Sequence, residues 1–332
     1  MPLPQPRGDT GNLRPDRFPT VKRKGQRLTD LVETLRHLTL RLEDVATNQA
    51  AIAYTIARSP ALIDFSVPCA DDPLSSRVCR QVDCGAEYRS WQEYFGRTMA
   101  VDRKDWEWAA ICRAMESAGV LKPGARALGF GVGSEPLVAA LAAKGLDIVA
   151  TDLALGDPRT SQWVEHSLSI STLRRPDICP DDELERRVTM RSVDMNHIPS
   201  DLRGFDVVWS CCAFEHLGSI EQGLRFVESS LDCLKPGGIA IHTTEFNLSS
   251  GDETEATGGT VAFRTQDFLE LERRIARRGH SMSPFTEGER GPGIFDYFVD
   301  VPPKHYGTLI CRLADYLITP AIIIAHAGPG GE

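Results

Sequence analysis

The sequence predicts an α/β protein built on a doubly wound, mostly parallel sheet. Residues 125–152 read as an apolar strand, a glycine-rich turn, an Ala/Leu-rich helix and a second apolar strand that ends in Asp152. Further apolar strands at 188–193, 205–210 and 239–244 alternate with helical stretches. Because parallel strands need long crossover connections, usually helices, this alternation favours a parallel sheet covered by helices on both faces.

The composition is that of a globular protein. The chain has 332 residues, 42% hydrophobic and 25% charged, which is enough for a packed core and an appendage or second domain. Its net charge of -9 argues against the basic surface of a nucleic-acid binder. No apolar run approaches the roughly 20 residues of a membrane span. The nine cysteines lack CxxC spacing and no secretory leader is present, which predicts reduced thiols in a cytoplasmic protein.

The N-terminal part divides into an arm and a heptad helix. Residues 1–26 are rich in Pro, Arg and Gly and are expected to form a disordered arm. In residues 27–59, mostly apolar residues recur at alternating spacings of three and four and would form one stripe, or seam, along a helix. This pattern predicts either a coiled coil or an amphipathic helix docked on its own domain. The first interpretation makes the protein a homo-oligomer through residues 28–56. The seam consists of Leu28, Leu31, Leu35, Leu38, Leu42, Val45, Gln49, Ile52 and Ile56.

Two further segments complete the predicted organisation. Residues 60–104 begin with Pro60 and form a connector or cap, and residues 105–327 form the main domain. The connector contains three cysteines at spacings of ten and five, which do not match the paired motifs of zinc sites. We therefore interpret Cys69, Cys79 and Cys84 as plain thiols.

The glycine-rich turn has the chemistry of a nucleoside-binding site. Without a Cβ, Gly129, Gly131 and Gly133 allow a ligand to approach the backbone closely. The following helix offers unpaired N–H groups at its start. Asp152, at the end of the next strand, can accept hydrogen bonds from ribose hydroxyls. This stretch alone does not distinguish a dinucleotide enzyme from other nucleoside binders.

Later strand ends carry further landmarks. Asp194 follows the strand at 188–193, and the loop from Cys211 to His216 follows the next strand. A Lys-Pro-Gly-Gly turn at 235–238 precedes the strand at 239–244. From about residue 105 to 325 these landmarks resemble those of class I S-adenosylmethionine-dependent methyltransferases. The resemblance implies a Rossmann-like sheet of seven strands, S-adenosyl-L-methionine as the cofactor, and methyl transfer as the reaction.

The resemblance also implies roles for individual residues. The methionine part of the cofactor is expected to contact Gly129, Gly131 and Gly133, and the ribose hydroxyls are expected to bind Asp152. The adenine is expected between Asp194 and Met195, and the sulfonium next to Cys211 or Cys212.

One position departs from the family pattern. Many members have a carboxylate where the first strand meets the turn, and this chain has Gly129. Glu135 is then a candidate for holding the cofactor's amine. Its other interpretation is a carboxylate in the first helical turn that complements the helix dipole.

The candidate catalytic residues follow from the demands of methyl transfer to oxygen. The acceptor hydroxyl must be aligned and must lose its proton, a task suited to histidine near neutral pH. His216, paired with Glu215 after the fourth strand, and Glu245, beyond the fifth, are the candidates. Their alternatives are a capping or packing histidine and a carboxylate paired within the fold. His242 lies within a strand and is interpreted as a core histidine.

A metal-assisted variant remains open. A divalent ion could lower the pKa of the acceptor hydroxyl, and imidazole and carboxylate groups could ligate it. The candidate ligands are His216, His242, Glu245 and Asp300, although nothing in their spacing demands a metal.

The acceptor is suggested only by a second resemblance. The runs VDMN, FEHLGS, HTTEFNLSSGDETEATGGT and VDVPP resemble uncharacterised bacterial methyltransferases associated with polysaccharide gene neighbourhoods. That analogy implies a sugar or glycan hydroxyl. The acceptor pocket is expected from the irregular segments 153–187 and 249–260.

Three alternatives remain: a methyltransferase for another small molecule or natural product, a nicotinamide-dependent oxidoreductase, and a non-catalytic scaffold. The oxidoreductase is disfavoured because Ser134 and Pro136 break the usual G-x-G-x-x-G spacing.

Overall fold

The computed structural model describes residues 24–154, 156–157, 159, 169–300 and 307–329. Residues 1–23, most of the predicted arm, lie outside this set, and the first helix begins at Lys24. The α-helices are α1 (Lys24–Ala57), α2 (Ala86–Tyr94), α3 (Arg103–Ser117), α4 (Leu137–Ala143), α5 (Asp181–Arg187), α6 (Ile220–Ser230) and α7 (Thr265–Arg277). The strands are β1 (Ser76–Val78), β2 (Arg126–Phe130), β3 (Asp147–Asp152), β4 (Val188–Ser192), β5 (Phe205–Cys211), β6 (Leu234–Asn247), β7 (Ser281–Met282), β8 (Phe285–Thr286), β9 (Val299–Asp300), β10 (Ile310–Leu313) and β11 (Tyr316–His326).

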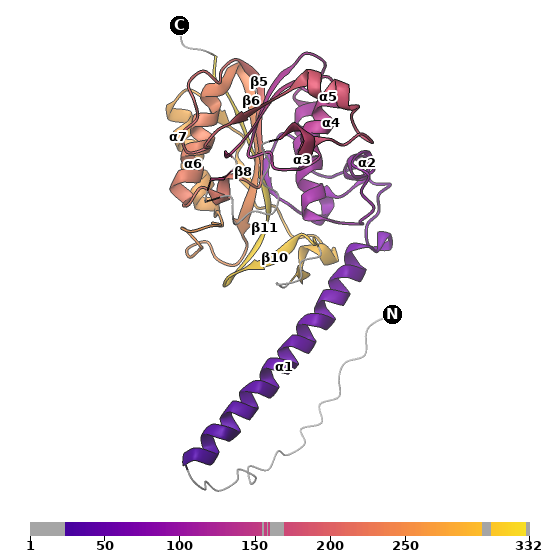
Figure 1. Cartoon of the computed structure of the whole chain (residues 1–332), viewed down its shortest axis with the longest axis vertical. Coiled ribbons are helices and arrows are strands. Elements are labelled where there is room, and N and C mark those ends of the chain that lie inside the picture. The colour runs from indigo at the N-terminus through magenta and orange to yellow at the C-terminus, as the bar shows by residue number, and fades with distance from the viewer. Residues whose placement is uncertain (1–23, 155, 158, 160–168, 301–306, 330–332) are drawn as a thin grey trace. The chain divides into compact units, whose positions relative to one another are not determined.

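The central sheet has the predicted Rossmann-like character. Its strands run in the order β4-β3-β2-β5-β6-β11-β1-β8. The first five in this order, β4, β3, β2, β5 and β6, are mutually parallel. Helices α6 and α7 cover one face and α3 and α4 the other (Figure 1). Each face therefore has its own hydrophobic core, as a doubly wound sheet requires.

The sheet is larger than the seven strands expected. Within the described residues it has eleven, because the short strands β1, β7 and β10 pair with the side of β11 that faces away from β6, and β8 and β9 pair with β1 and β10. One of them, β1, comes from the segment predicted to be a connector, and it pairs antiparallel with β11 and parallel with β8. Residues 60–104 thus contribute to the main sheet, which the sequence pattern did not reveal.

Two local predictions for β6 were wrong. The Lys-Pro-Gly-Gly run is not a separate turn: it forms a bulge inside β6, where Phe205 pairs with Leu234 but Val207 already pairs with Ile239. The residue that follows β11 also holds the bulge, because the Gly237 N–H donates to the carbonyl of Ala327. The strand also continues to Asn247, so Glu245 lies within it and not beyond its end.

Helix α1 belongs to two compact units. Residues up to Asn48 form one, and Gln49 to the end of the chain form the other. Within the second unit, Ala50, Ala53 and Ala57 of α1 are buried. None of the helices in the described part of the chain is both long enough and apolar enough to cross a bilayer.

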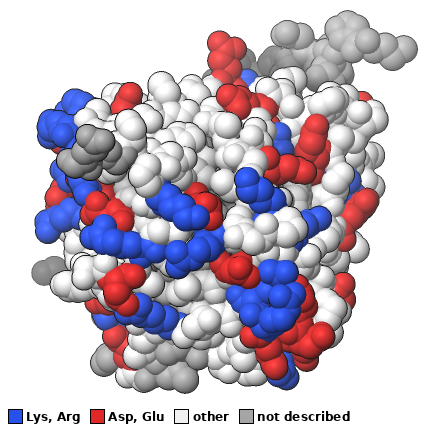
Figure 2. Space-filling model, turned by 90° about the horizontal axis from the view of Figure 1, so that it is seen from above, with Lys and Arg blue, Asp and Glu red and all other residues white. Residues whose placement is uncertain are grey.

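The surface of the second unit carries charges of both signs. Figure 2 shows Lys and Arg interspersed with Asp and Glu on the face seen from above. Several arginines are engaged in ion pairs, such as Arg274 with Glu221 and Arg278 with Asp232. Such pairs add little stability individually but leave a mixed surface.

Gly129 is required by the packing of β2 against β5. It pairs with Trp209, a fully buried residue, and a Cβ at Gly129 would lie 2.7 Å from Trp209 Cη2 and from Val132 Cγ1. Real Cβ contacts are never this short. The indole therefore occupies the space that a carboxylate side chain would need, which explains the departure from the family pattern.

We expect Gly129→Ala to lower the free energy of unfolding by about 1–3 kcal/mol, the usual cost of overpacking a core. The matched control is Gly251→Ala, because Gly251 has open space where its Cβ would stand. The control should change stability by no more than about 0.5 kcal/mol. Urea denaturation measures both values, and equal stabilities for the two variants would contradict the steric explanation.

Candidate functional site

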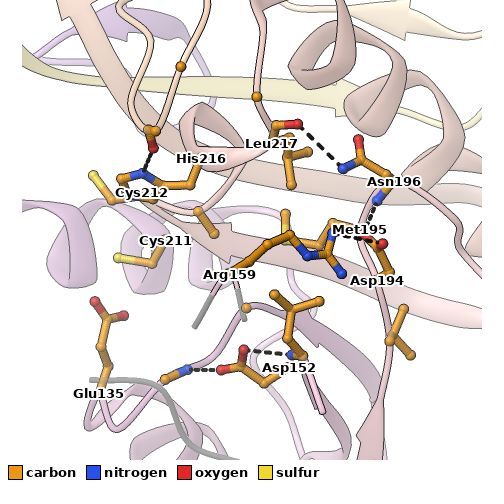
Figure 3. Close-up of a pocket in the computed structure, with 18 of the residues that line it drawn as sticks. Glu135, Asp152, Arg159, Asp194, Met195, Asn196, Cys211, Cys212, His216 and Leu217 are labelled. Atoms are coloured by element: carbon orange, nitrogen blue, oxygen red, sulfur yellow. Dashed lines mark hydrogen bonds and ion pairs between the residues drawn. The ribbon is translucent and has the colours of Figure 1, made fainter. Parts of the chain in front are cut away.

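A pocket opens at the carboxyl ends of the parallel strands, where ligands bind in folds of this kind. Its volume is about 540 Å³, within the range of small-molecule sites. It is lined by Lys104, Gly131, Gly133, Glu135, Asp152, Leu153, Arg159, Val193, Asp194, Met195, Asn196, Cys211, Cys212, Ala213, His216, Leu217, Gly218, Gly258 and Gly259. Figure 3 shows most of this lining. Most of the predicted site residues are in this set. Gly129, Glu215 and Glu245 are not.

The glycine turn and Asp152 form one hydrogen-bonded unit. Gly131 and Gly133 have φ of 57° and 53°, a left-handed conformation that favours glycine. The N–H of Gly133 donates to Asp152 Oδ2 over 2.9 Å, and the N–H of Leu153 donates to Oδ1 over 2.8 Å. The carboxylate thus ties the turn after β2 to the end of β3.

Asp194, Met195, Asn196 and Leu217 line one end of the pocket (Figure 3). Asp194 accepts a hydrogen bond from the Asn196 N–H over 2.9 Å and pairs with Arg159 over 3.0 Å. Burial opposes ionisation of Asp194, but these two groups outweigh it and lower its pKa. The carboxylate is therefore charged near neutral pH.

Lys104 and Glu135 form an ion pair at the other end of the pocket. Asp102 caps α3 by accepting the Lys104 N–H over 2.8 Å, which places Lys104 in the first helical turn. Its Nζ lies 3.0 Å from Glu135 Oε1 and 3.5 Å from Glu107 Oε2. Burial raises the pKa of Glu135, and Lys104 partly offsets this rise. Glu135 precedes Pro136, the cap residue of α4, so it is not a first-turn residue.

Lys104 was not predicted because its partner in the pocket, Glu135, is remote in the chain. Glu135 is 31 residues away. The available signal was Asp102, a residue type preferred at helix N-caps, which marks a helix start at Arg103, two residues before the expected start of the main domain. Asn196 was also missed. Arg159, Gly258 and Gly259 fall in the segments 153–187 and 249–260 from which the acceptor pocket was expected, although none of the three was named as a site residue.

The two adjacent cysteines lie against buried carboxylates. Cys211 Sγ donates to Glu107 Oε2 over 3.3 Å, and Cys212 Sγ is 3.9 Å from Glu245 Oε1. Burial raises the pKa of both thiols well above their usual range, so both are neutral. Cys212 has φ of 44°, which is strained for a side chain. Its N–H is held by the carbonyl and hydroxyl oxygens of Thr243, each 3.1 Å away.

His216 is oriented by backbone and carboxylate groups. Its Nδ1 lies 2.8 Å from the Gly259 carbonyl, which can only accept, so Nδ1 carries the proton. The other nitrogen, Nε2, then has the lone pair of a base, and it lies 3.9 Å from Glu215 Oε1. Burial raises the pKa of Glu215, His216 opposes the rise and Glu245 adds to it. Thr244 Oγ1 donates to Glu215 Oε2 over 3.0 Å.

Glu245 is engaged within the fold. It forms an ion pair with Arg103, whose Nη1 also lies 2.6 Å from Cys311 Sγ. Glu245 does not line the pocket itself, but its carboxylate contacts Cys212, which does.

The four metal ligands considered from sequence do not come together. His242 is fully buried, with Nδ1 2.8 Å from Ser210 Oγ and Nε2 3.0 Å from Ser230 Oγ, so both ring nitrogens are engaged. Among the described residues, the grouping with metal-ligand spacing is Cys212, Glu215 and Glu245, which includes neither His242 nor Asp300. A metal at the predicted set is not supported.

A comparison with known protein families matches one part of this chain. Residues 128–242 match the family model described as a methyltransferase domain. No curated protein sequence matches the chain.

Solved structures with the same fold share little sequence with this chain. The [4+2]-cyclase SpnF is 19% identical with a TM-score of 0.42, covering 68% of this chain and 84% of that one. A phosphoethanolamine N-methyltransferase from Haemonchus contortus, in complex with S-adenosyl-L-methionine, is 15% identical with a TM-score of 0.41, covering 73% and 57%. An S-adenosylmethionine-dependent methyltransferase from Mesorhizobium loti is 12% identical with a TM-score of 0.38, covering 64% and 95%.

The environment of His242 makes stability depend on pH. Burial lowers its pKa from 6.5 to about 3, so it stays neutral when folded and takes up a proton on unfolding below pH 6.5. Stability from this group is complete above pH 6.5 and is lost progressively towards pH 3. Between pH 7 and pH 5 the loss is about 2 kcal/mol, at roughly 1.4 kcal/mol for each unit below 6.5.

We expect His242→Gln to remove this part of the pH dependence. Urea denaturation at pH 7 and pH 5 should show a drop that is about 2 kcal/mol smaller in the variant than in the unsubstituted protein. The comparison of slopes separates this effect from any overall loss of stability. His280 and His326, whose pKa values burial also lowers, contribute equally to both proteins. An identical drop in the two proteins would contradict a neutral, buried His242.

The family match therefore supports a methyltransferase domain over residues 128–242 of this Rossmann-like chain.

Proposed function

We propose that the protein is an S-adenosylmethionine-dependent methyltransferase that O-methylates a hydroxyl of a sugar or glycan. The observation that carries the proposal is the composition of one pocket. It combines the glycine turn, a carboxylate at the end of β3, a carboxylate after β4, and His216 after β5. A family match over the same region supports it.

The residues present fit the cofactor from end to end. Asp152 would bind the ribose hydroxyls, and Asp194 with Met195 would surround the adenine. Cys211 and Cys212, neutral and polarizable, would line the sulfonium. Glu135 and Lys104 together match a zwitterion, because the carboxylate can bind the amine of the methionine part and the ammonium can bind its carboxyl group. Glu135 would thus take the role of the acid that is missing at Gly129, and Lys104 would add a contact to the carboxyl group.

The catalytic proposal concerns a single proton. When bound, S-adenosylmethionine supplies a methyl group that an acceptor oxygen takes as the carbon–sulfur bond breaks. His216 Nε2 would accept the proton of the acceptor hydroxyl, since Nδ1 is held protonated by Gly259. Glu215, 3.9 Å away, would stabilise the imidazolium that forms. Glu245 would act as a positioning residue, through Arg103 on one side and Cys212 on the other.

The choice of acceptor rests on the resemblance to polysaccharide-associated enzymes. The loop that carries much of that resemblance, 249–260, delivers Gly258 and Gly259 to the pocket, so the likeness falls on a segment next to His216. Another small-molecule acceptor is the main alternative.

Nine free cysteines among the described residues support the expected cytoplasmic, reducing location. The heptad spacing of residues 28–56 supports a homo-oligomer.

Calorimetry with S-adenosylmethionine and with its demethylated product tests the proposal. Binding of either, with none for NAD, is the expected result. Heat with NAD alone would replace the proposal with an oxidoreductase, and no heat with any of the three would favour a scaffold.

We expect Lys104→Met to weaken binding of the demethylated cofactor roughly 10- to 100-fold. This is the effect of losing one charge-assisted hydrogen bond worth about 1.5–3 kcal/mol. Glu135→Gln should weaken binding by a similar factor. The control is Lys122→Met, because Lys122 is exposed and does not line the pocket. Calorimetric affinities equal to that of the control would remove the ion pair from the cofactor site.

We expect His216→Ala to lower kcat by about 10²- to 10⁴-fold, the usual contribution of a general base, while cofactor affinity changes little. Glu215→Gln, which removes the charge but keeps the volume, should lower kcat less. His37→Ala, a histidine exposed on α1, provides the control. Single-turnover kinetics with an identified acceptor measure the rate. If His216→Ala loses cofactor affinity instead, its role is binding and not catalysis.

A further inference from the structure

Helix α1 presents an apolar stripe that none of the described residues of its own unit covers. The stripe repeats at spacings of three and four residues over nearly three heptads. Its side chains are between 50% and 69% exposed, although they are large and aliphatic. They are Leu28, Leu31, Leu35, Leu38, Leu42 and Val45, which we call the exposed seam.

The end of the same helix is buried through different residues. Ala50, Ala53 and Ala57 are in the core of the second unit and do not continue the seam, which would pass through Gln49, Ile52 and Ile56. Gln49 instead donates its side-chain amide to the Val299 carbonyl over 2.7 Å. Docking of the last turns therefore does not use the exposed seam. The two interpretations of the heptad pattern apply to different parts of one helix.

Charges are arranged so that they do not oppose pairing of the seam. In the heptad set by Leu28 and Leu31, the acidic residues of this part of α1 fall at outer positions: Asp30, Glu33, Glu43 and Asp44. The positions that flank the seam between Val32 and Asn48 are uncharged except for Arg41. Side chains at flanking positions decide partner choice in coiled coils, so an uncharged flank does not repel an identical helix.

We propose that a second copy of this chain covers the exposed seam, and that the two helices pair as a coiled coil over residues 28–45. A three-four repeat is complementary to itself, because the same residues supply both the knobs and the holes of the contact. Apolar stripes of this extent are rarely left in water by a soluble chain. The interface ends at Val45 and is shorter than the 28–56 helix. All pocket-lining residues lie outside it, so the inference is independent of the proposed reaction.

The test is the molar mass of the full chain in solution, measured by light scattering after size exclusion at several micromolar concentrations. A mass of twice 36.6 kDa is expected. The variant Leu35→Asp/Leu42→Asp should give the monomer mass. The matched control is Leu40→Asp, because Leu40 is exposed on the same helix but lies off the seam. It should keep the mass of the unsubstituted protein.

Two outcomes would overturn the proposal. One is a monomeric unsubstituted protein across the concentration range, which would leave the seam to another partner or to another part of the chain. The other is an oligomer that the seam variant does not dissociate, which would place the interface elsewhere. Cofactor calorimetry on the seam variant keeps the result apart from the proposed function, since binding should be unchanged when the oligomer is lost.

Discussion

The hydrogen bond from the Gly133 N–H to Asp152 fixes the geometry on which the site depends. It joins the turn after β2 to the end of β3, and residues of both segments line one side of the pocket. The other rim is set by β5, whose Trp209 packs directly on Gly129. The end of β2 and the glycine turn are thus held by an indole at Gly129 and by a carboxylate at Gly133. The indole leaves no room for an acidic side chain at Gly129, and the charged groups at that end of the pocket are Glu135 and Lys104 of α3.

Residues close together in the chain were predictable where a local rule governs them. The alternation of strands and helices, the glycine turn and the carboxylates at 152 and 194 follow from periodicity and strand-end position, and the structure brings these carboxylates to one pocket. Glu135 was identified as a candidate, but its partner Lys104 was not. The two residues are 31 positions apart in the chain, and their ion pair joins the first turn of α3 to the segment before α4.

The features that sequence could not provide depend on pairing partners distant in the chain. The Lys-Pro-Gly-Gly run has the composition of a free turn, and only its contact with Ala327 makes it a strand bulge. Glu245 reads as a residue beyond a strand because the strand's true length is set by β11, which pairs with it as far as Asn247. Its ion pair with Arg103 then turns a candidate catalytic carboxylate into part of the supporting structure.

The position of β1 has a consequence for how the chain reaches this fold. Ser76 exchanges hydrogen bonds with Ile324, at a sequence separation of 248 residues. Loops of this length close slowly, since their entropy must be lost before the contact contributes any stability. Strands β2 to β6, whose carboxyl ends form the pocket, pair through connections much shorter than this separation. The pairing of β1 with β11 therefore carries a larger loop-closure cost than the pairing of the strands that form the pocket.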